Sequence, residues 1–73
     1  MTKAQEQALR WLNRHNGDGC FDRNGVLLAA GESAPHERRT WNALRDMGFV
    51  ELYDLHTKRK RLRITPLGQE AIA

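Results

Sequence analysis

A run of basic residues between two strand-like segments constrains the fold of this chain more than any other feature. Residues 49–55 are rich in aromatic and branched side chains, and Arg61-Leu62-Arg63-Ile64 alternates polar and apolar residues strictly. A period of two is typical of a strand with one buried face, so Leu62 and Ile64 are expected to face the core. The two segments therefore predict a hairpin. Its basic end consists of Lys58, Arg59, Lys60, Arg61 and Arg63.

The whole positive excess of the chain is in this hairpin. The sequence has 12 Lys and Arg against 9 Asp and Glu, so without the five hairpin cations seven basic residues face nine acidic ones. Such a focused patch indicates a polyanionic partner, nucleic acid before membrane. The structural alternative is that these cations protect the edge of a sheet against aggregation.

Length and cysteine content predict a single small domain over residues 1–73, with one core. Cys20 is the one cysteine, so no internal disulfide can form, as expected in a reducing compartment. Residues 1–7 are polar and the longest apolar run, 26–30, is too short to span a bilayer. We therefore expect a soluble cytoplasmic protein without a membrane partner, associated with the nucleoid when it is bound to DNA.

Local signals predict an α+β order of elements. Thr2 and Gln5 have the spacing of a capping box for a helix from Lys3 to His15, and Thr65 is a suitable N-cap for a short C-terminal helix that starts at Pro66. Between them we expect a small strand at 20–22, a short helix at 26–30 ending at Gly31, a helix at 34–47 capped by Ser33, and strands at 49–55 and 61–64.

The helix expected at 34–47 has one apolar and one polar face. At 100° per residue, Ala34, Trp41 and Leu44 fall on one side, which is the expected core side. The opposite side and its flanks carry His36, Arg39, Thr40, Asn42, Ala43 and Asp46.

These residues resemble the winged helix-turn-helix proteins, in particular the DNA-binding core of regulators of the multiple-antibiotic-resistance-repressor type. The resemblance covers residues 26–68, and its most specific parts are Leu44-Arg45-Asp46-Met47-Gly48-Phe49-Val50 and Ile64-Thr65-Pro66-Leu67-Gly68. It implies a small winged helix: a three-helix core, a two- to three-stranded antiparallel sheet and a short C-terminal helix.

By this resemblance, the helix at 34–47 is a recognition helix for the major groove and the hairpin is a wing. His36, Arg39, Thr40, Asn42 and Ala43 then fall where base edges and phosphates are contacted, and Lys58, Arg59, Lys60, Arg61 and Arg63 supply the wing. Arg38 and Arg45 either contact phosphate or pair with nearby acids. The implied function is sequence-selective binding of double-stranded DNA, by a small transcriptional regulator or a recombination accessory factor of a phage or mobile element.

Other functions remain open at this stage. The same fold can dock on a host or partner protein without binding DNA. Trp11, on the first helix, is either a core residue or the contact of a homodimer. Residues 18–25 resemble a calcium loop, but Cys20 and Gly31 then occupy the two end ligand positions, where carboxylates are needed. No catalytic motif or metal-ligand spacing occurs, so we expect neither an enzyme nor a cofactor.

Overall fold

The first helix begins at the capping box that the sequence predicts. In the computed structural model, which describes residues 1–54 and 60–73, α1 spans Lys3–Arg14. The amide of Gln5 donates to Thr2 Oγ1 over 3.1 Å, and the amide of Thr2 donates to Gln5 Oε1 over 2.8 Å. Both bonds satisfy amide groups that have no partner within the helix. The expectation of a helix from Lys3 to His15 is confirmed.

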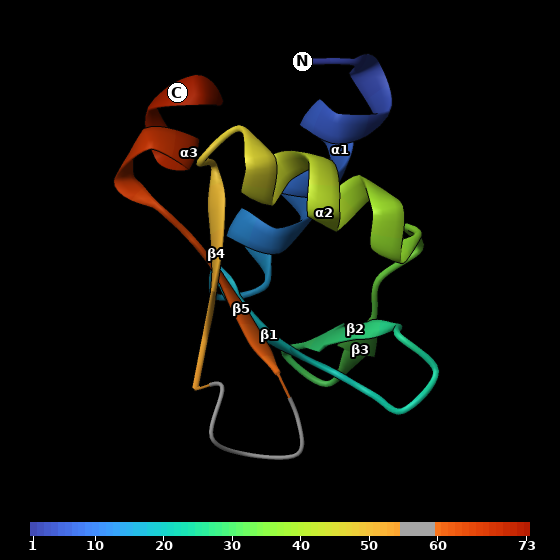
Figure 1. The fold of residues 1–73 in the computed structure, drawn as a ribbon. Helices are drawn as coiled ribbons and strands as arrows, with labels where there is room; N and C mark the ends of the chain where they lie inside the picture. Colours follow the sequence, from blue (N-terminus) through green and yellow to red (C-terminus); the bar gives the residue numbers. More distant parts are fainter. Residues whose placement is uncertain (55–59) are drawn as a thin grey trace.

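Five antiparallel strands form one sheet in the order β3-β2-β1-β5-β4 (Figure 1). The strands are β1 Asp18–Phe21, β2 Leu27–Ala29, β3 Glu32–Ser33, β4 Val50–Tyr53 and β5 Arg61–Ile64. The remaining helices are α2, Arg38–Asp46, and α3, Pro66–Ala71. The α+β class and the strands on both sides of the basic run are confirmed. The sheet is larger than the two to three strands expected.

The short helix expected at 26–30 is wrong, because this segment is a β-strand. Leu27 and Ala29 of β2 are buried, whereas Leu28 between them is 37% exposed, which is the period of a strand. Ala30 and Gly31 have φ angles of 51° and 78°, and Ala29 pairs with Glu32 across them. Two positive φ angles in a two-residue loop form a hairpin turn whose twist matches that of strands. Gly31 therefore turns a hairpin and does not end a helix.

The helix expected at 34–47 is shorter than predicted, and its N-cap is Glu37 in place of Ser33. Ser33 lies in β3, and the amide of Ala34 donates to the carbonyl of Leu27 over 2.7 Å, so the chain is still extended there. Pro35 accounts for the absence of helix at Ala34, because a proline disfavours helical backbone at the residue before it. The expected pair of consecutive helices is therefore a β2–β3 hairpin followed by one helix.

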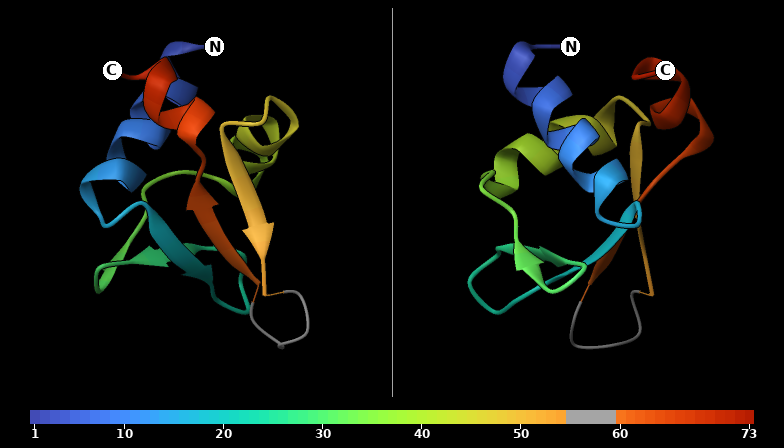
Figure 2. Two further views of the ribbon diagram at one scale, coloured as in Figure 1. Left: turned by 90° about the vertical axis from the view of Figure 1, so that its left-hand side faces the viewer. Right: turned by 180° about the vertical axis from the view of Figure 1, so that it is seen from behind.

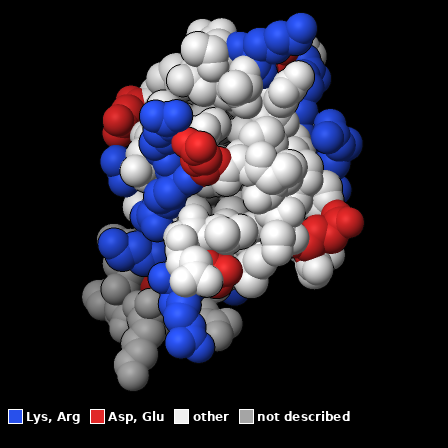
Figure 3. Space-filling view, turned by 90° about the vertical axis from the view of Figure 1, so that its right-hand side faces the viewer, with Lys and Arg blue, Asp and Glu red and all other residues white. Residues whose placement is uncertain are grey.

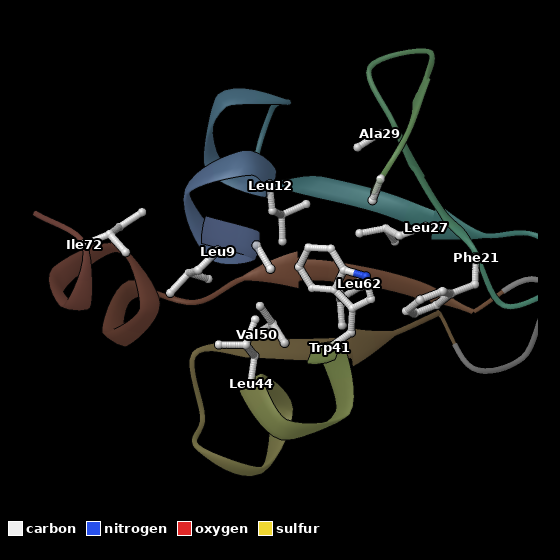
Figure 4. Packing of buried hydrophobic residues seen from close by; sticks show 12 residues of the cluster. Leu9, Leu12, Phe21, Leu27, Ala29, Trp41, Leu44, Val50, Leu62 and Ile72 are labelled. Atoms are coloured by element: carbon white, nitrogen blue, oxygen red, sulfur yellow. The ribbon is translucent and has the colours of Figure 1, made fainter. Parts of the chain in front are cut away.

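Helices α1 and α2 cover one face of the sheet and share a single hydrophobic cluster with it. Figure 4 shows Trp41 and Leu44 of α2 directed toward Leu62 and Val50 of the sheet, with Leu9 of α1 beside them. Trp41 is 1% exposed and Leu44 is fully buried, as predicted for the apolar side of this helix. Burial of such side chains contributes roughly 1.5–3 kcal/mol each. No helix in residues 1–54 and 60–73 has the length and apolarity needed to cross a membrane.

The third helix lies at the end of the molecule that carries both chain termini (Figure 2). Thr65 is its N-cap, as predicted, and accepts a hydrogen bond from the amide of Gly68 over 3.0 Å. The Thr65 hydroxyl also donates to the carbonyl of Gly48 over 2.7 Å, which joins α3 to the turn after α2. This threonine therefore fixes the direction in which the chain leaves β5.

Candidate nucleic-acid interface

The exposed side of α2 carries arginines that lie next to acidic side chains. Arg39 is the most exposed of them: its side chain is 87% exposed, and its Nε is 2.7 Å from Glu37 Oε2. At the other end of the helix, Arg45 Nη2 is 3.3 Å from Asp46 Oδ1. Exposed pairs of this kind contribute little to stability, so both guanidinium groups can exchange a carboxylate for another anion at low cost.

Arg38 is held more firmly, at the N-terminal end of α2. Its guanidinium carbon lies 3.9 Å from the centroid of the Phe21 ring, and its Nε donates to Asn42 Oδ1 over 3.2 Å. The cation–π contact and the hydrogen bond orient the group without neutralising its charge. Asn42 is predicted from the sequence to contact a base edge. Its side-chain amide oxygen instead accepts this hydrogen bond from Arg38.

His36 lies before α2 and not on it, since the helix begins later than predicted. Its half-buried ring meets the Trp41 ring edge-on, with 5.8 Å between centroids. Burial lowers the pKa of His36 below its usual value of 6.5, because the charged imidazolium loses hydration there. Thr40 and Ala43 are on α2 and are half-buried.

The two arginines of β5 form ion pairs on the outer face of the sheet, away from α2. They alternate with Leu62, which is buried under α2, so they project from the opposite face. Arg61 donates to the hydroxyl of Tyr53 over 2.8 Å and lies 3.3 Å from Asp18 Oδ1. Arg63 lies 2.6 Å from Glu51 Oε1. This face is therefore a network of paired charges.

Tyr53 is at the centre of that network. Its hydroxyl donates to Asp18 Oδ2, and the guanidinium of Arg63 lies 4.5 Å from its ring centroid. Burial raises the pKa of Tyr53 above 10.0, and the hydrogen bond to Asp18 adds to this. Hydrogen bonding to Tyr53 raises the pKa of Arg61, and hydrogen bonding to Glu51 raises the pKa of Arg63. Both arginines thus remain charged, each with a carboxylate partner beside it.

The start of β5 brings the hairpin close to α2. The amide of Phe21 donates to the carbonyl of Lys60 over 3.0 Å, and Phe21 also supports Arg38. Lys60 is exposed, and strand alternation places it on the same side of the sheet as Leu62, where α2 lies. Lys58 and Arg59 lie outside the described residues.

A further exposed cation, Arg23, lies in the turn between β1 and β2, two residues after Phe21. Figure 3 shows a column of Lys and Arg side chains along one edge of the molecule, with an acidic group next to it. The sequence predicted a turn at Asn24-Gly25, which is confirmed, but it gave no signal that singled out Arg23.

Trp11 and Cys20, two further residues considered from the sequence, lie on α1 and β1. Trp11 is half-buried and stacks on His15, with 3.9 Å between ring centroids and 16° between ring planes. The homodimer through Trp11 stays a prediction. Cys20 is half-buried. Among the residues that the structure describes, no group of three or more His, Cys, Asp or Glu side chains could hold a metal ion.

Comparison of the chain with models of protein families, with curated proteins and with solved structures found no match in any of the three. The function proposed below therefore depends on the geometry and charge of this chain.

Proposed function

We propose that the chain binds double-stranded DNA as a variant winged helix, with α2 in the major groove and the β4–β5 hairpin as the wing. The observation that carries the proposal is the shared support of the two elements by Phe21. Its ring lies against the guanidinium of Arg38 of α2, and its amide donates to the carbonyl of Lys60, the residue before β5. A helix and a hairpin that are fixed to each other can present their cations to one duplex.

The size of α2 suits this role. Nine helical residues extend about 14 Å at 1.5 Å per residue, which is comparable to the roughly 12 Å width of the major groove. Arg39 is the side chain best placed to reach a base edge, because it is the most exposed and its partner Glu37 is on the surface as well. Arginine reads guanine through two parallel hydrogen bonds.

The wing in this proposal uses Lys60 together with Lys58 and Arg59, whose phosphate contacts remain predictions from the sequence. Arg61 and Arg63 take a different role, because each is paired with a carboxylate on the face of the sheet away from α2. Arg63 joins β5 to β4, and Arg61 joins β5 to Tyr53 of β4 and Asp18 of β1. With Arg38, four cations are then available for phosphates, so the logarithm of the binding constant should fall against the logarithm of salt concentration with a slope of about −3.6.

Two matched variants test the assignment. Arg39→Ala and Arg63→Ala each remove one exposed arginine whose Nε lies within 2.7 Å of a glutamate, but only Arg39 is on α2. A preferred duplex is first selected from a random pool, and fluorescence anisotropy then measures its affinity and that of a scrambled duplex. Arg39→Ala should lose about 1–3 kcal/mol of discrimination between the two duplexes.

Arg63→Ala should retain both affinity and discrimination within about twofold, since its charge faces away from the duplex in this arrangement. Equal losses in the two variants would refute the placement of α2 in the groove. Circular dichroism confirms that both variants are folded.

A second candidate function is a module that binds a protein partner. It is favoured by the acidic side chains Glu37 and Asp46, which give the outer side of α2 both signs of charge. A surface that carries both signs of charge is complementary to a protein surface with both signs, and less so to the uniformly negative phosphate backbone of DNA. Absence of any shift of mixed duplex fragments at low salt would favour this candidate over DNA.

A further inference from the structure

Three cations without a carboxylate partner are linked to Phe21, one through its side chain, one through its backbone and one through its position in the chain. Arg38 lies over its ring, Lys60 accepts its amide hydrogen through the backbone, and Arg23 follows it by two residues. Within residues 1–54 and 60–73, none of the three forms an ion pair, whereas the arginines at 10, 39, 45, 61 and 63 each do. Of the five described Lys and Arg residues without an ion pair, these three are on α2, in the β1–β2 turn and next to β5, and the other two, Lys3 and Arg14, are on α1.

The turn that carries Arg23 is closed by its own hydrogen bonds. Asp22 Oδ1 accepts from the amides of Asn24 and Val26 over 2.8 and 2.9 Å, and the amide of Gly25 donates to the carbonyl of Asp22 over 3.1 Å. The carboxylate nearest to Arg23 in the chain is thus directed to the backbone. The turn holds its shape without using the arginine.

The same turn lies near the start of α2. A Cβ atom added to Gly25 would be 4.0 Å from the Cβ of Arg38. Arg23 therefore belongs to a turn that approaches the first residue of the proposed recognition helix.

We propose that Arg23, Arg38 and Lys60 together bind the backbone phosphates that separate the groove entered by α2 from the groove faced by the hairpin. This inference rests on the proposed function, and adds the β1–β2 turn as a third element that contacts the duplex. The recognised group is the phosphodiester, which every base sequence presents alike.

The chemistry of the three side chains fits a phosphodiester. Arg38 uses Nε for Asn42, which leaves its two terminal nitrogens to donate to phosphate oxygens. Its stacking on Phe21 fixes the group before binding, so little side-chain entropy is lost when a phosphate arrives. Lys60 and Arg23 are both exposed and add positive charge to the proposed site.

The test compares Arg23→Ala with Arg14→Ala. Arg14 is also exposed and has no ion pair among the described residues, but it is in the last turn of α1. Binding to a fluorescein-labelled duplex of mixed sequence is measured by anisotropy between about 50 and 200 mM salt. With Arg23 as a fifth phosphate contact, the logarithm of the binding constant should fall against the logarithm of salt concentration with a slope of about −4.5 for the wild-type protein and about −3.6 for Arg23→Ala. The loss of one contact is roughly an eightfold loss of affinity at 0.1 M salt.

The loss should be the same for the preferred and the scrambled duplex, and Arg23→Lys should restore most of the slope because a point charge suffices for a phosphate. Arg14→Ala should bind as the unchanged protein does. If Arg23→Ala matches Arg14→Ala while Arg39→Ala still loses discrimination, the inference is wrong and the proposed function stands. If Arg23→Ala changes the preference between sequences, the residue contacts a base and the phosphate assignment is overturned. If the wild-type protein binds no duplex, both the proposed function and this inference are wrong.

Discussion

Gly68 in α3 offers a test in which helix propensity and tertiary packing predict opposite signs. Alanine in place of a helical glycine stabilises an exposed helix by roughly 1 kcal/mol. In this fold, however, a Cβ at position 68 would lie 2.1 Å from the carbonyl oxygen of Phe49 and 2.9 Å from Ile64 Cγ1. Ordinary contact begins at 3.4 Å, so the helix and the carbonyl would have to separate by about 1.3 Å.

The carbonyl of Phe49 cannot give way cheaply. It accepts a hydrogen bond from the amide of Thr65 over 3.0 Å, and Thr65 is the N-cap of the same helix. Overpacking of this kind costs roughly 1–3 kcal/mol, and more where backbone must move. We take about 3 kcal/mol for the clash and subtract about 1 kcal/mol of helix propensity, so Gly68→Ala should destabilise the fold by about 2 kcal/mol.

Urea denaturation followed by tryptophan fluorescence measures this difference, and the melting temperature should fall by roughly 8–16 °C for a domain of this size. Gln69→Ala is the control, because Gln69 is the next residue of α3 and is exposed. Its effect should stay within about 0.5 kcal/mol. A Gly68→Ala protein as stable as the unchanged one would refute the close packing of α3 on Phe49.

Two titrations test the environments of single groups. Tyr53 is the one tyrosine of the chain, so phenolate absorbance reports it alone, and its midpoint should lie above 10.0. Because the pKa of Tyr53 is raised in the folded state, its hydroxyl contributes stability that is complete below about pH 10 and is lost as the pH rises through the folded-state pKa. A titration midpoint at or below 10.0 would contradict the burial of Tyr53 and its hydrogen bond to Asp18. The pKa of His36 is lowered from 6.5, so its contribution to stability is present above about pH 6.5 and is lost as the pH falls through the folded-state pKa. His36→Gln should therefore weaken the fall in unfolding free energy between about pH 7.5 and 5.5, and an unchanged pH dependence would show that the ring is solvated.

The elements that the sequence predicted correctly depend on neighbours in the chain. Thr2 and Gln5 are three residues apart, and their reciprocal hydrogen bonds form within one helical turn. Thr65 caps α3 through Gly68, again three residues on. The alternation around Leu62 requires only that one face of the strand be buried. In each case the element is determined by residues a few positions apart in the chain or by the alternation of buried and exposed side chains.

The predictions that failed depend on partners far along the chain. Residues 26–30 are apolar enough for a short helix, but β2 pairs with β1 through Cys20 and Leu28 and buries Leu27 and Ala29. Pairing with an existing strand satisfies backbone groups that a five-residue helix would leave open. The absence of helix at Ala34 had a local signal in Pro35, which restricts the residue before it.

The sequence by itself determined where charge is concentrated, which segments alternate and where two helices begin, because these properties are set by composition and by contacts within a few residues. Only the tertiary structure decided which of the basic residues are available to a partner. Asp18, 43 residues before Arg61, pairs with it across the sheet. Phe21 holds Arg38 at the start of α2 and leaves its charge unpaired. A run of cations that looks uniform in the sequence is thus divided by the fold, because neighbouring residues of a strand face opposite sides of a sheet.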